Sequence, residues 1–348
     1  MKTAPGPRLV CPRGVVPARF SFLCFRTAVP HTASNKIIVI CGPTGVGKTG
    51  FAIGLAQKFG GEIVGADSMQ IYRGMDIGTA KPTAAEQAAV VHHLVDVVDP
   101  GEEFDAAEYG RRAEKCVAAL IADGRTPFVV GGTGLYIKAL VYGLAEAAAS
   151  DSQVHDRLAA ELDRSGPPAM HQRLAQVDPQ SARRIHPNDT FRILRALEVY
   201  HLTGRSLTAH HADHGFARAR FDTLRIGLTL PRPELYARID RRVDAMLAQG
   251  LVAEVRALLA KGIDPRLKSM QSLGYRHMTD YLQGRLEWDE AVRTLKRDHR
   301  RYAKRQMTWF GADGLVRWLR PDQLLEAVVL VEDFLTGNRP PRQISYSD

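Results

Sequence analysis

The chain has 348 residues and a formal net charge of +9; 45% of its residues are hydrophobic and 24% are charged. This length suits one large domain or two moderate ones, and the composition is ordinary for a globular protein. No run of about 18 apolar residues occurs, so we expect no membrane span and no membrane partner. Four scattered cysteines without a CxxC pair argue against a disulfide scaffold and a structural zinc site. The positive charge suggests an anionic partner such as nucleic acid, although a basic protein without such a partner fits equally well.

Residues 1–35 differ in composition from the rest of the chain. They contain five Lys or Arg residues, five prolines and no acidic residue. Because the prolines interrupt a long helix, we interpret the segment as a disordered extension, or as the product of a start codon placed too far upstream. An organellar transit peptide is the alternative, and it would replace the cytoplasmic location that we otherwise expect by an organellar one.

The first strong motif is a phosphate-binding loop. An apolar run at 37–40 predicts a buried parallel strand, and the apolar spacing between residues 51 and 59 predicts a helix. A complete G-x-x-x-x-G-K-[ST] pattern stands between them, formed by Gly42, Pro43, Thr44, Gly45, Val46, Gly47, Lys48 and Thr49. Such a loop surrounds phosphate oxygens with backbone N–H groups, while its lysine adds a charge and its threonine can ligate magnesium. The motif predicts a di- or triphosphate ligand, but kinase, NTPase and group transferase all remain open, as does a glycine turn without a ligand.

Two further strands are predicted to end in polar side chains. Residues 63–64 lead to Asp67, and residues 127–130 lead to a glycine turn that contains Thr133. The carboxyl ends of parallel strands face the ligand crevice of a doubly wound sheet. Asp67 alone could be a helix cap, a magnesium ligand or a catalytic base, and glycine turns like the one before Thr133 are common in α/β proteins. The pattern therefore predicts a crevice and leaves its chemistry open.

Several segments together carry a resemblance to a known family. They are GPTGVGKT at 42–49, DSMQIYRGMDIGTAKP at 67–82, HHLVDVVDP at 92–100, VGGTGLY at 130–136, RIHPND at 184–189, RALEV at 195–199, TG at 203–204, LGYR at 273–276 and YAKRQ at 302–306. On these segments the chain resembles the tRNA dimethylallyltransferase (isopentenyltransferase) family, from about Lys36 to about Trp318. The run at 67–82 is the most specific part.

The resemblance implies a fold and a reaction. The fold is α/β, with a P-loop NTPase-like parallel sheet core, an inserted helical domain and C-terminal helices. The reaction transfers a dimethylallyl group from dimethylallyl diphosphate to N6 of adenosine at tRNA position 37, in the anticodon stem-loop, and releases diphosphate. The P-loop would bind the diphosphate of the isoprenoid, with Mg²⁺ as the cofactor and Thr49 as its ligand. A monomer is also expected.

The resemblance assigns roles to single residues as well. Asp67 matches the general base that takes a proton from N6, Thr133 the hydroxyl between the reacting groups, and Arg238 the arginine near the diphosphate. Arg241 and Arg242 are close competitors of Arg238. The expected tRNA-contacting residues are Asp67, Ser68, Met69, Gln70, Thr133, His155, Phe191, Arg192, Ile193, Leu194, Arg195, Met270, Gln271, Ser272, Leu273, Gly274 and Tyr275. Many relatives have an arginine where this chain has His155, and a neutral imidazole would lose a phosphate contact.

The order of these patterns predicts the domain organisation. We expect a disordered extension at 1–35, the first part of the α/β core at 36–143, and an inserted helical tRNA-binding domain at 144–214. The core would continue at 215–348, with a strand at 224–230 and basic C-terminal helices.

Two groups of basic side chains have more than one interpretation. A helix over 288–310 would place residues 293, 297, 300 and 304 on one face, which suits an RNA backbone or, alternatively, a solvated face with salt bridges. His210, His211 and His214 predict a surface loop rather than a metal site.

Three other functions remain as alternatives. An enzyme that prenylates free adenine nucleotides would need neither the helical insertion nor the basic helix. A small-molecule kinase would have no obvious use for the run at 67–82. A nucleic-acid-binding switch NTPase would need an apolar strand that ends in an acid, for which residues 94–96 are a poor candidate.

Overall fold

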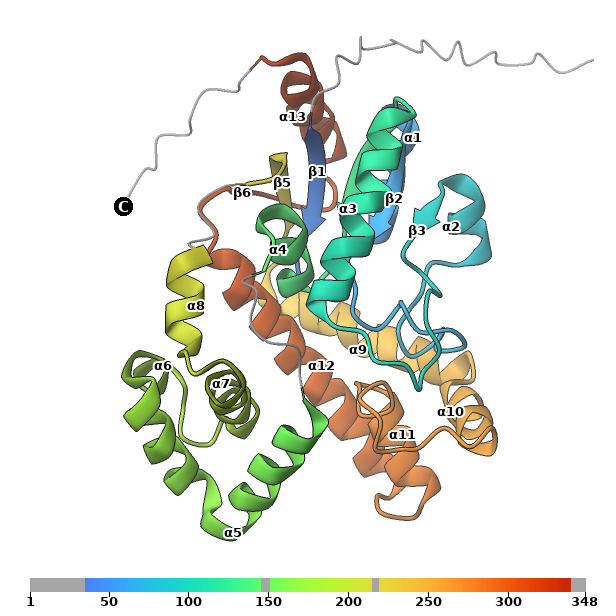
Figure 1. Cartoon of the computed structure of the whole chain (residues 1–348). Helices are drawn as coiled ribbons and strands as arrows, with labels where there is room; N and C mark the ends of the chain where they lie inside the picture. Colours follow the sequence, from blue (N-terminus) through green and yellow to red (C-terminus); the bar gives the residue numbers. More distant parts are fainter. Residues whose placement is uncertain (1–34, 145–150, 215–218, 339–348) are drawn as a thin grey trace, which may run out of the picture. The chain divides into compact units, whose positions relative to one another are not determined.

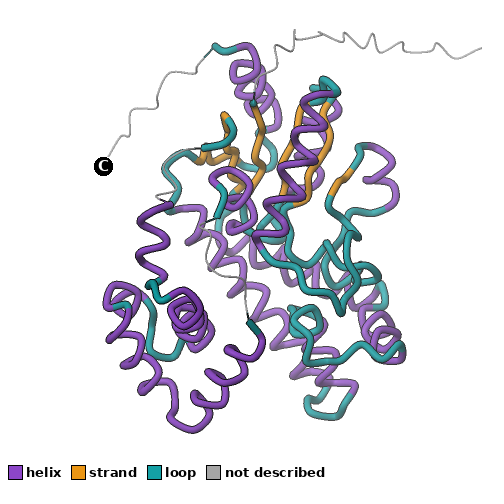
Figure 2. The backbone as a smooth tube through the Cα atoms, in the orientation of Figure 1, coloured by secondary structure: helices purple, strands orange, loops and turns teal. Residues whose placement is uncertain are grey.

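The computed structural model describes residues 35–144, 151–214 and 219–338. The expected extension at 1–35 lies outside these ranges, except for Asn35. Figure 1 shows strands with helices on both sides, and Figure 2 shows that long loops join several of these elements.

Six parallel strands form the core sheet, in the order β3-β2-β4-β1-β5-β6. They span Lys36–Cys41 (β1), Gly61–Gly65 (β2), His92–His93 (β3), Thr126–Val130 (β4), Asp222–Leu228 (β5) and Val316–Leu319 (β6). In the middle of the sheet, Ile38 of β1 lies opposite Phe128 of β4 and Leu224 of β5. The chain leaves β1 in one direction for β2 and later arrives at β5 on the other side. Such a reversal of strand order creates the ligand crevice of open α/β sheets.

Helices cover both faces of this sheet. Successive residues of a strand point to opposite faces. Ile38 and Ile40 therefore pack with α1 (Lys48–Lys58) and α13 (Leu324–Thr336), whereas Ile37 and Val39 pack with α3 (Ala106–Ala122) and α4 (Gly134–Tyr142). An all-parallel sheet needs this double cover because its strands are apolar on both faces. The short helix α2 (Ala84–Ala89) precedes β3 and begins at a capping box between Thr83 and Glu86.

Four helices near the C-terminus extend the core past the carboxyl ends of the strands. They are α9 (Arg232–Ala248), α10 (Leu251–Ala260), α11 (Tyr275–Leu282) and α12 (Trp288–Gly311). Helix α12 runs beside α9 and α11 in Figure 1 and packs against both. Its buried residues Ala291, Leu295, Ala303 and Phe310 form one apolar side, as expected for an amphipathic helix.

Between β4 and β5 the described chain contains helices and loops but no strand. Helix α5 (Ser152–Val177) is kinked at Gly166, whose φ is 78°, and two prolines follow the kink. Helices α6 (Pro179–Arg184), α7 (Thr190–Thr203) and α8 (Leu207–His214) complete this group, which has a core of its own around Leu158, Leu174 and Ile193. The expected domain boundaries stay a prediction, since residues 145–150 and 215–218 lie outside the described ranges.

Two local expectations need correction. His210, His211 and His214 belong to helix α8 rather than to a loop, and the ring of His210 contacts the hydroxyl of Thr203 at 3.1 Å. Strand β5 ends at Leu228, before the expected residue 230, because Pro231 opens α9 shortly afterwards. Over the described ranges, no three His, Cys, Asp or Glu side chains are grouped as a metal site would require. No helix within those ranges is long and apolar enough to cross a membrane.

Candidate active site

The phosphate loop connects the end of β1 to the start of α1. Gly42, Gly45 and Gly47 have φ values of 132°, 79° and 105°, which L side chains rarely adopt. A Cβ on Gly42 would also lie 2.5 Å from the carbonyl oxygen of Leu228. The loop thus requires glycine at these positions for its own conformation, and Gly47 places the N-terminus of α1 at the crevice, where an anion is favoured.

Lys48 is the charged group of this loop. Its Nζ donates hydrogen bonds to the carbonyls of Gly42, at 3.0 Å, and Pro43, at 2.8 Å. Burial, and next the nearby positive charge of Arg242, lower the pKa of Lys48 to about 8. A phosphate bound beside both cations would offset their repulsion.

A cavity of about 110 Å³ opens in front of the phosphate loop. Its polar lining includes Thr44, Lys48, Thr49, Asp67, Arg242 and Tyr302. A second cavity of about 510 Å³ shares Thr44, Asp67 and Tyr302 with the first, and it extends to Gln271, Ser272 and Leu273. Asp67 therefore lies where the cavity at the phosphate loop meets a larger one that borders the loop before α11.

A turn after β2 holds the Asp67 carboxylate. Its Oδ1 accepts hydrogen bonds from the backbone N–H groups of Met69, at 2.9 Å, and Gln70, at 3.4 Å. Thr133 supports this turn, because its hydroxyl oxygen accepts a hydrogen bond from the Ser68 N–H at 3.0 Å. The structure thus brings together the two residues that the sequence predicted for the crevice, because Thr133 holds the turn that carries Asp67.

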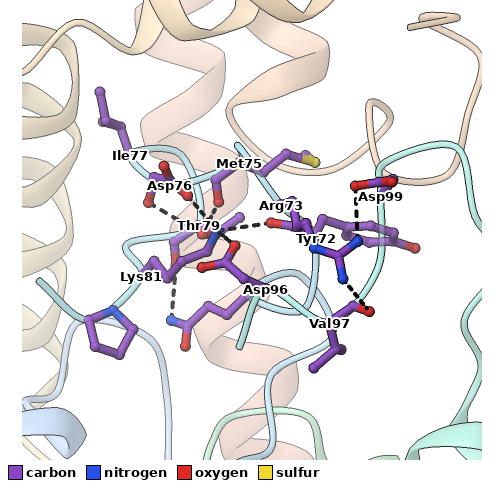
Figure 3. A network of polar contacts seen from close by, with 12 residues as sticks. Tyr72, Arg73, Met75, Asp76, Ile77, Thr79, Lys81, Asp96, Val97 and Asp99 are labelled. Atoms are coloured by element: carbon purple, nitrogen blue, oxygen red, sulfur yellow. Dashed lines mark hydrogen bonds and ion pairs between the residues drawn. The ribbon is translucent and has the colours of Figure 1, made fainter. Parts of the chain in front are cut away.

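The long loop after Asp67 is fixed from inside by Lys81 (Figure 3). The Lys81 side chain is only 4% exposed, and its Nζ binds the carboxylates of Asp76 and Asp96. Lys81 also donates to the carbonyl of Tyr72 at 2.9 Å. The loop is therefore tied to the segment after β3, and a charge inside it is balanced by two carboxylates.

Helix α12 closes the site from the opposite side. Gln306 accepts a hydrogen bond from the Thr44 N–H at 2.8 Å and donates to the carbonyl of Gly132 at 2.9 Å. Tyr302, one helical turn earlier, lines both cavities. Burial, and next the negative charge of Asp67, raise the pKa of Tyr302, so it presents a neutral hydroxyl. Both residues belong to the YAKRQ segment that contributes to the family resemblance, but the sequence analysis assigned neither of them a role.

The structure separates the competing arginines of α9. Arg238 donates a hydrogen bond to Glu234 at 3.1 Å. Arg238 lines neither of the two cavities described above. Arg242 lines the first cavity. Its positive charge lowers the pKa of Lys48, and the negative charge of Asp67 acts on Arg242 in turn. Of these two arginines, Arg242 lies at the cavity in front of the phosphate loop, and Arg238 does not.

The residues expected to contact tRNA fall into exposed and buried groups. Phe191 is 76% exposed, and His155 and Arg192 are exposed as well. Ile193 and Leu194 are buried in the core of α5–α7 instead, and Arg195 is paired with Glu198 at 2.8 Å.

In the loop before α11, the side chains of Met270 and Tyr275 are fully buried. They pack inside the protein, so RNA contact there would fall to Gln271, Ser272 and Leu273, which line the second cavity. Gly274, next to Tyr275, has a φ of 90°.

The basic face of α12 is partly neutralised. Arg293 pairs with Glu290, Arg297 with Asp298, and Arg300 with Asp240 of α9. Lys304 is exposed. The face therefore carries the salt bridges of one interpretation and keeps an exposed lysine for the other, and its contact with RNA stays a prediction.

The parallel sheet and the loop at the end of β1 define a P-loop protein of the α/β class. A family model described as IPP transferase matches residues 70–313. A tRNA dimethylallyltransferase of Desulfosudis oleivorans is 55% identical over 301 residues, which are 86% of this chain and 96% of that protein. The corresponding protein of Syntrophobacter fumaroxidans is 56% identical over 282 residues, or 81% of this chain and 82% of that protein.

Solved structures agree with these relatives. A tRNA isopentenylpyrophosphate transferase from Bacillus halodurans is 40% identical, with a TM-score of 0.66, and the match covers 87% of this chain and 98% of that one. A eukaryotic dimethylallyltransferase acting on tRNA is 30% identical, with a TM-score of 0.74, over 89% of this chain and 81% of that one. The chain belongs to the tRNA dimethylallyltransferase family. This confirms the expected family, fold class and enzyme class, a prenyl-group transferase.

Proposed function

We propose that the chain transfers a dimethylallyl group from dimethylallyl diphosphate to N6 of adenosine at position 37 of tRNA and releases diphosphate. One observation carries this assignment to particular residues: Asp67 lies at the junction of the phosphate-loop cavity and the second cavity. A carboxylate at that junction can meet the acceptor amine on one side and the donor on the other.

On the donor side, the phosphate loop would hold the diphosphate. Its backbone N–H groups, Lys48 and Arg242 supply positive potential around the oxygens on which charge grows as the C1–O bond breaks. In a dry cavity, fixed donors and cations stabilise that charge more strongly than water does. We assign Arg242 to this role in place of Arg238, because only Arg242 lines the cavity.

On the acceptor side, adenine would leave its stack and enter the second cavity, as a base must when chemistry occurs on it. N6 then forms a bond to C1 of the dimethylallyl group, while the electron pair of the C1–O bond leaves with diphosphate. The N6 proton passes to the Asp67 carboxylate, which acts as the general base. Hydrogen bonds from Met69 and Gln70 occupy Oδ1, and this leaves Oδ2 to receive the proton.

Magnesium suits the oxygen atoms that this cavity offers. The Thr49 hydroxyl lines it, and Mg²⁺ prefers such oxygen ligands alongside phosphate oxygens. Thr49 would hold the ion together with the diphosphate, and the ion would neutralise charge on the leaving group.

The RNA substrate is the anticodon stem-loop, which the group α5–α8 would contact through exposed residues such as Phe191 and Arg192. The protein works as a monomer in the cytoplasm. Free adenine nucleotides are the second candidate acceptor, and the exposed aromatic ring of Phe191 on α7 favours RNA, because unstacked RNA bases stack on such rings.

The test uses the purified protein with magnesium, dimethylallyl diphosphate and either tRNA, AMP or no acceptor. Mass spectrometry of digested tRNA should find the added group on adenosine 37. Asp67→Asn should lower the rate about 10²- to 10⁴-fold, the range typical of general-base catalysis, and should leave diphosphate binding in place. Transfer to AMP alone, or to a different adenosine, would contradict the assignment of the acceptor.

A further inference from the structure

A single carboxylate on α10 binds two separate parts of the site. Oε2 of Glu254 accepts hydrogen bonds from the N–H groups of Asp76, at 3.0 Å, and Ile77, at 2.8 Å. Its Oε1 accepts from the Gly78 N–H at 3.1 Å and from the Tyr275 hydroxyl at 2.5 Å. Four donors therefore converge on one side chain, and charge-assisted hydrogen bonds of this kind are the stronger ones.

The two parts also pack closely where Glu254 joins them. A Cβ on Gly78 would lie 2.5 Å from the ring of Tyr275, so the loop backbone sits directly against that ring. Burial, and next the charge of Glu254, raise the pKa of Tyr275, which keeps its hydroxyl as a donor. Glu254 thus fixes residues 76–78 and Tyr275 at van der Waals contact.

Each of these parts leads directly to one side of the reaction centre. Beyond Gly78, the carbonyls of Thr79 and Ala80 accept hydrogen bonds from the Gln70 side chain at 3.2 Å and 3.1 Å. The Gln70 backbone N–H in turn donates to Asp67. In the other direction, Tyr275 follows the residues 271–273 that line the second cavity.

We propose that Glu254 is a positioning residue: it clamps residues 76–78 onto Tyr275 and thereby sets Asp67 relative to the wall of the acceptor cavity. The inference rests on the proposed function, in which Asp67 receives the proton from the acceptor. Glu254 itself lines neither the phosphate-loop cavity nor the acceptor cavity. Its effect should therefore appear in the transfer step and not in donor binding.

The variant Glu254→Gln tests the clamp with almost no change in volume. An amide offers one oxygen and one NH₂ group, so at least one set of N–H or O–H donors would face another donor. We expect the single-turnover rate on tRNA to fall about 10²-fold at saturating substrates, the loss typical of a misplacement of about 1 Å. The dissociation constant for pyrophosphate and the KM for tRNA should each stay within about 3-fold of wild type, which is well below a tenfold change in affinity.

Two further variants make the result specific. Tyr275→Phe removes only the hydroxyl and should lower the rate less, and the double variant should be no slower than Glu254→Gln, because both changes break the same clamp. Glu114→Gln is the matched control: Glu114 lies on α3, its side chain is 45% exposed, and it pairs with Arg220 at 2.6 Å. It should leave the rate unchanged.

The outcomes separate the inference from the proposed function. No transfer to tRNA by the wild-type protein would overturn the proposed function itself. Normal wild-type transfer with an unchanged rate in Glu254→Gln would overturn the clamp alone. A fall in pyrophosphate affinity and in Tm that parallels the fall in rate would also overturn it, since Glu254 would then only hold the fold together. Faster amide exchange at residues 76–78 in the variant, with the phosphate loop unaffected, would support it.

Discussion

The side-chain oxygen of Gln306 accepts a hydrogen bond from the backbone N–H of Thr44 at 2.8 Å. The same amide donates to the carbonyl of Gly132 at 2.9 Å, so one buried side chain of α12 joins the two glycine turns of the crevice. The conformation of the phosphate loop therefore depends on a helix from the other end of the chain.

Gln306→Glu should destabilise the protein and weaken diphosphate binding. A carboxylate cannot donate to Gly132, and it would bury a charge beside the phosphate site. Leaving a buried polar group unsatisfied costs about 1–3 kcal/mol, and more when the group is charged. Urea denaturation should show this loss, whereas Gln283→Glu, at an exposed position, should show almost none. Equal stability of the two variants would contradict the bridging role.

Arg242→Gln should weaken pyrophosphate binding much more than Arg238→Gln. Arg242 lines the phosphate-loop cavity, whereas Arg238 is engaged by Glu234. A hydrogen bond to a charged group contributes about 1.5–3 kcal/mol, which corresponds to roughly a 10- to 100-fold change in affinity. Titration calorimetry with both variants compares the two positions directly. A larger loss in Arg238→Gln would restore the assignment made from the family resemblance.

Pyrophosphate affinity should fall as the pH rises above about 8. Burial and the charge of Arg242 lower the pKa of Lys48 to about 8, so the free protein loses this cation in that range. Binding favours protonated Lys48, which makes the affinity highest below the free pKa and lower above it. The difference in binding free energy between wild type and Lys48→Met, measured from pH 7 to 10, cancels the titration of the ligand. A difference that is independent of pH would show that Lys48 stays charged.

The same depressed pKa has an opposite consequence for stability. Between about pH 8 and the ordinary lysine value of about 10.4, the unfolded chain binds more protons at Lys48 than the folded one. The contribution of this group to the unfolding free energy should therefore rise with pH across that window. Denaturation of wild type and Lys48→Met without ligand would detect it as a difference in slope.

Gly78→Ala should destabilise the loop against Tyr275. The added Cβ would lie 2.5 Å from the aromatic ring, and overpacking of this kind costs about 1–3 kcal/mol. Gly101→Ala adds the same methyl group where no atom lies within 4 Å and should be nearly neutral. Thermal denaturation of both variants is sufficient, and a neutral Gly78→Ala would mean that the loop moves away from Tyr275 easily.

The sequence predicted best those features that depend on local backbone requirements. The P-loop has fixed glycines at short spacing, so the strand, the loop and helix α1 were all predictable from residues 37–59. The parallel sheet followed from apolar runs that end in polar turns such as those at Asp67 and Thr133. Family membership is confirmed by the comparisons, while the residue roles remain predictions.

Features that depend on how elements pack were harder to predict. Arg238 and Arg242 are four residues apart on one face of α9, so periodicity cannot tell which of them reaches the phosphates. Their difference is that Arg242 lines the cavity at the phosphate loop, whereas Arg238 pairs with Glu234. Met270 and Tyr275 were expected at the RNA but are buried, because the fold of the loop before α11 decides which of its side chains face outward. Glu254 was not selected at all; a lone acid in the apolar segment LVAEVRALLA was its only signal.

The bridge between Thr44 and Gln306 spans 262 residues of sequence. During synthesis, the loop 42–49 leaves the ribosome long before helix α12, which holds it. Long-range contacts of this kind are slow to form, since the intervening chain must first be ordered. A nascent or truncated chain that lacks α12 would carry the phosphate-binding sequence without a finished pocket. We therefore expect a chain that stops before α12 to bind diphosphate more weakly than the chain that contains it.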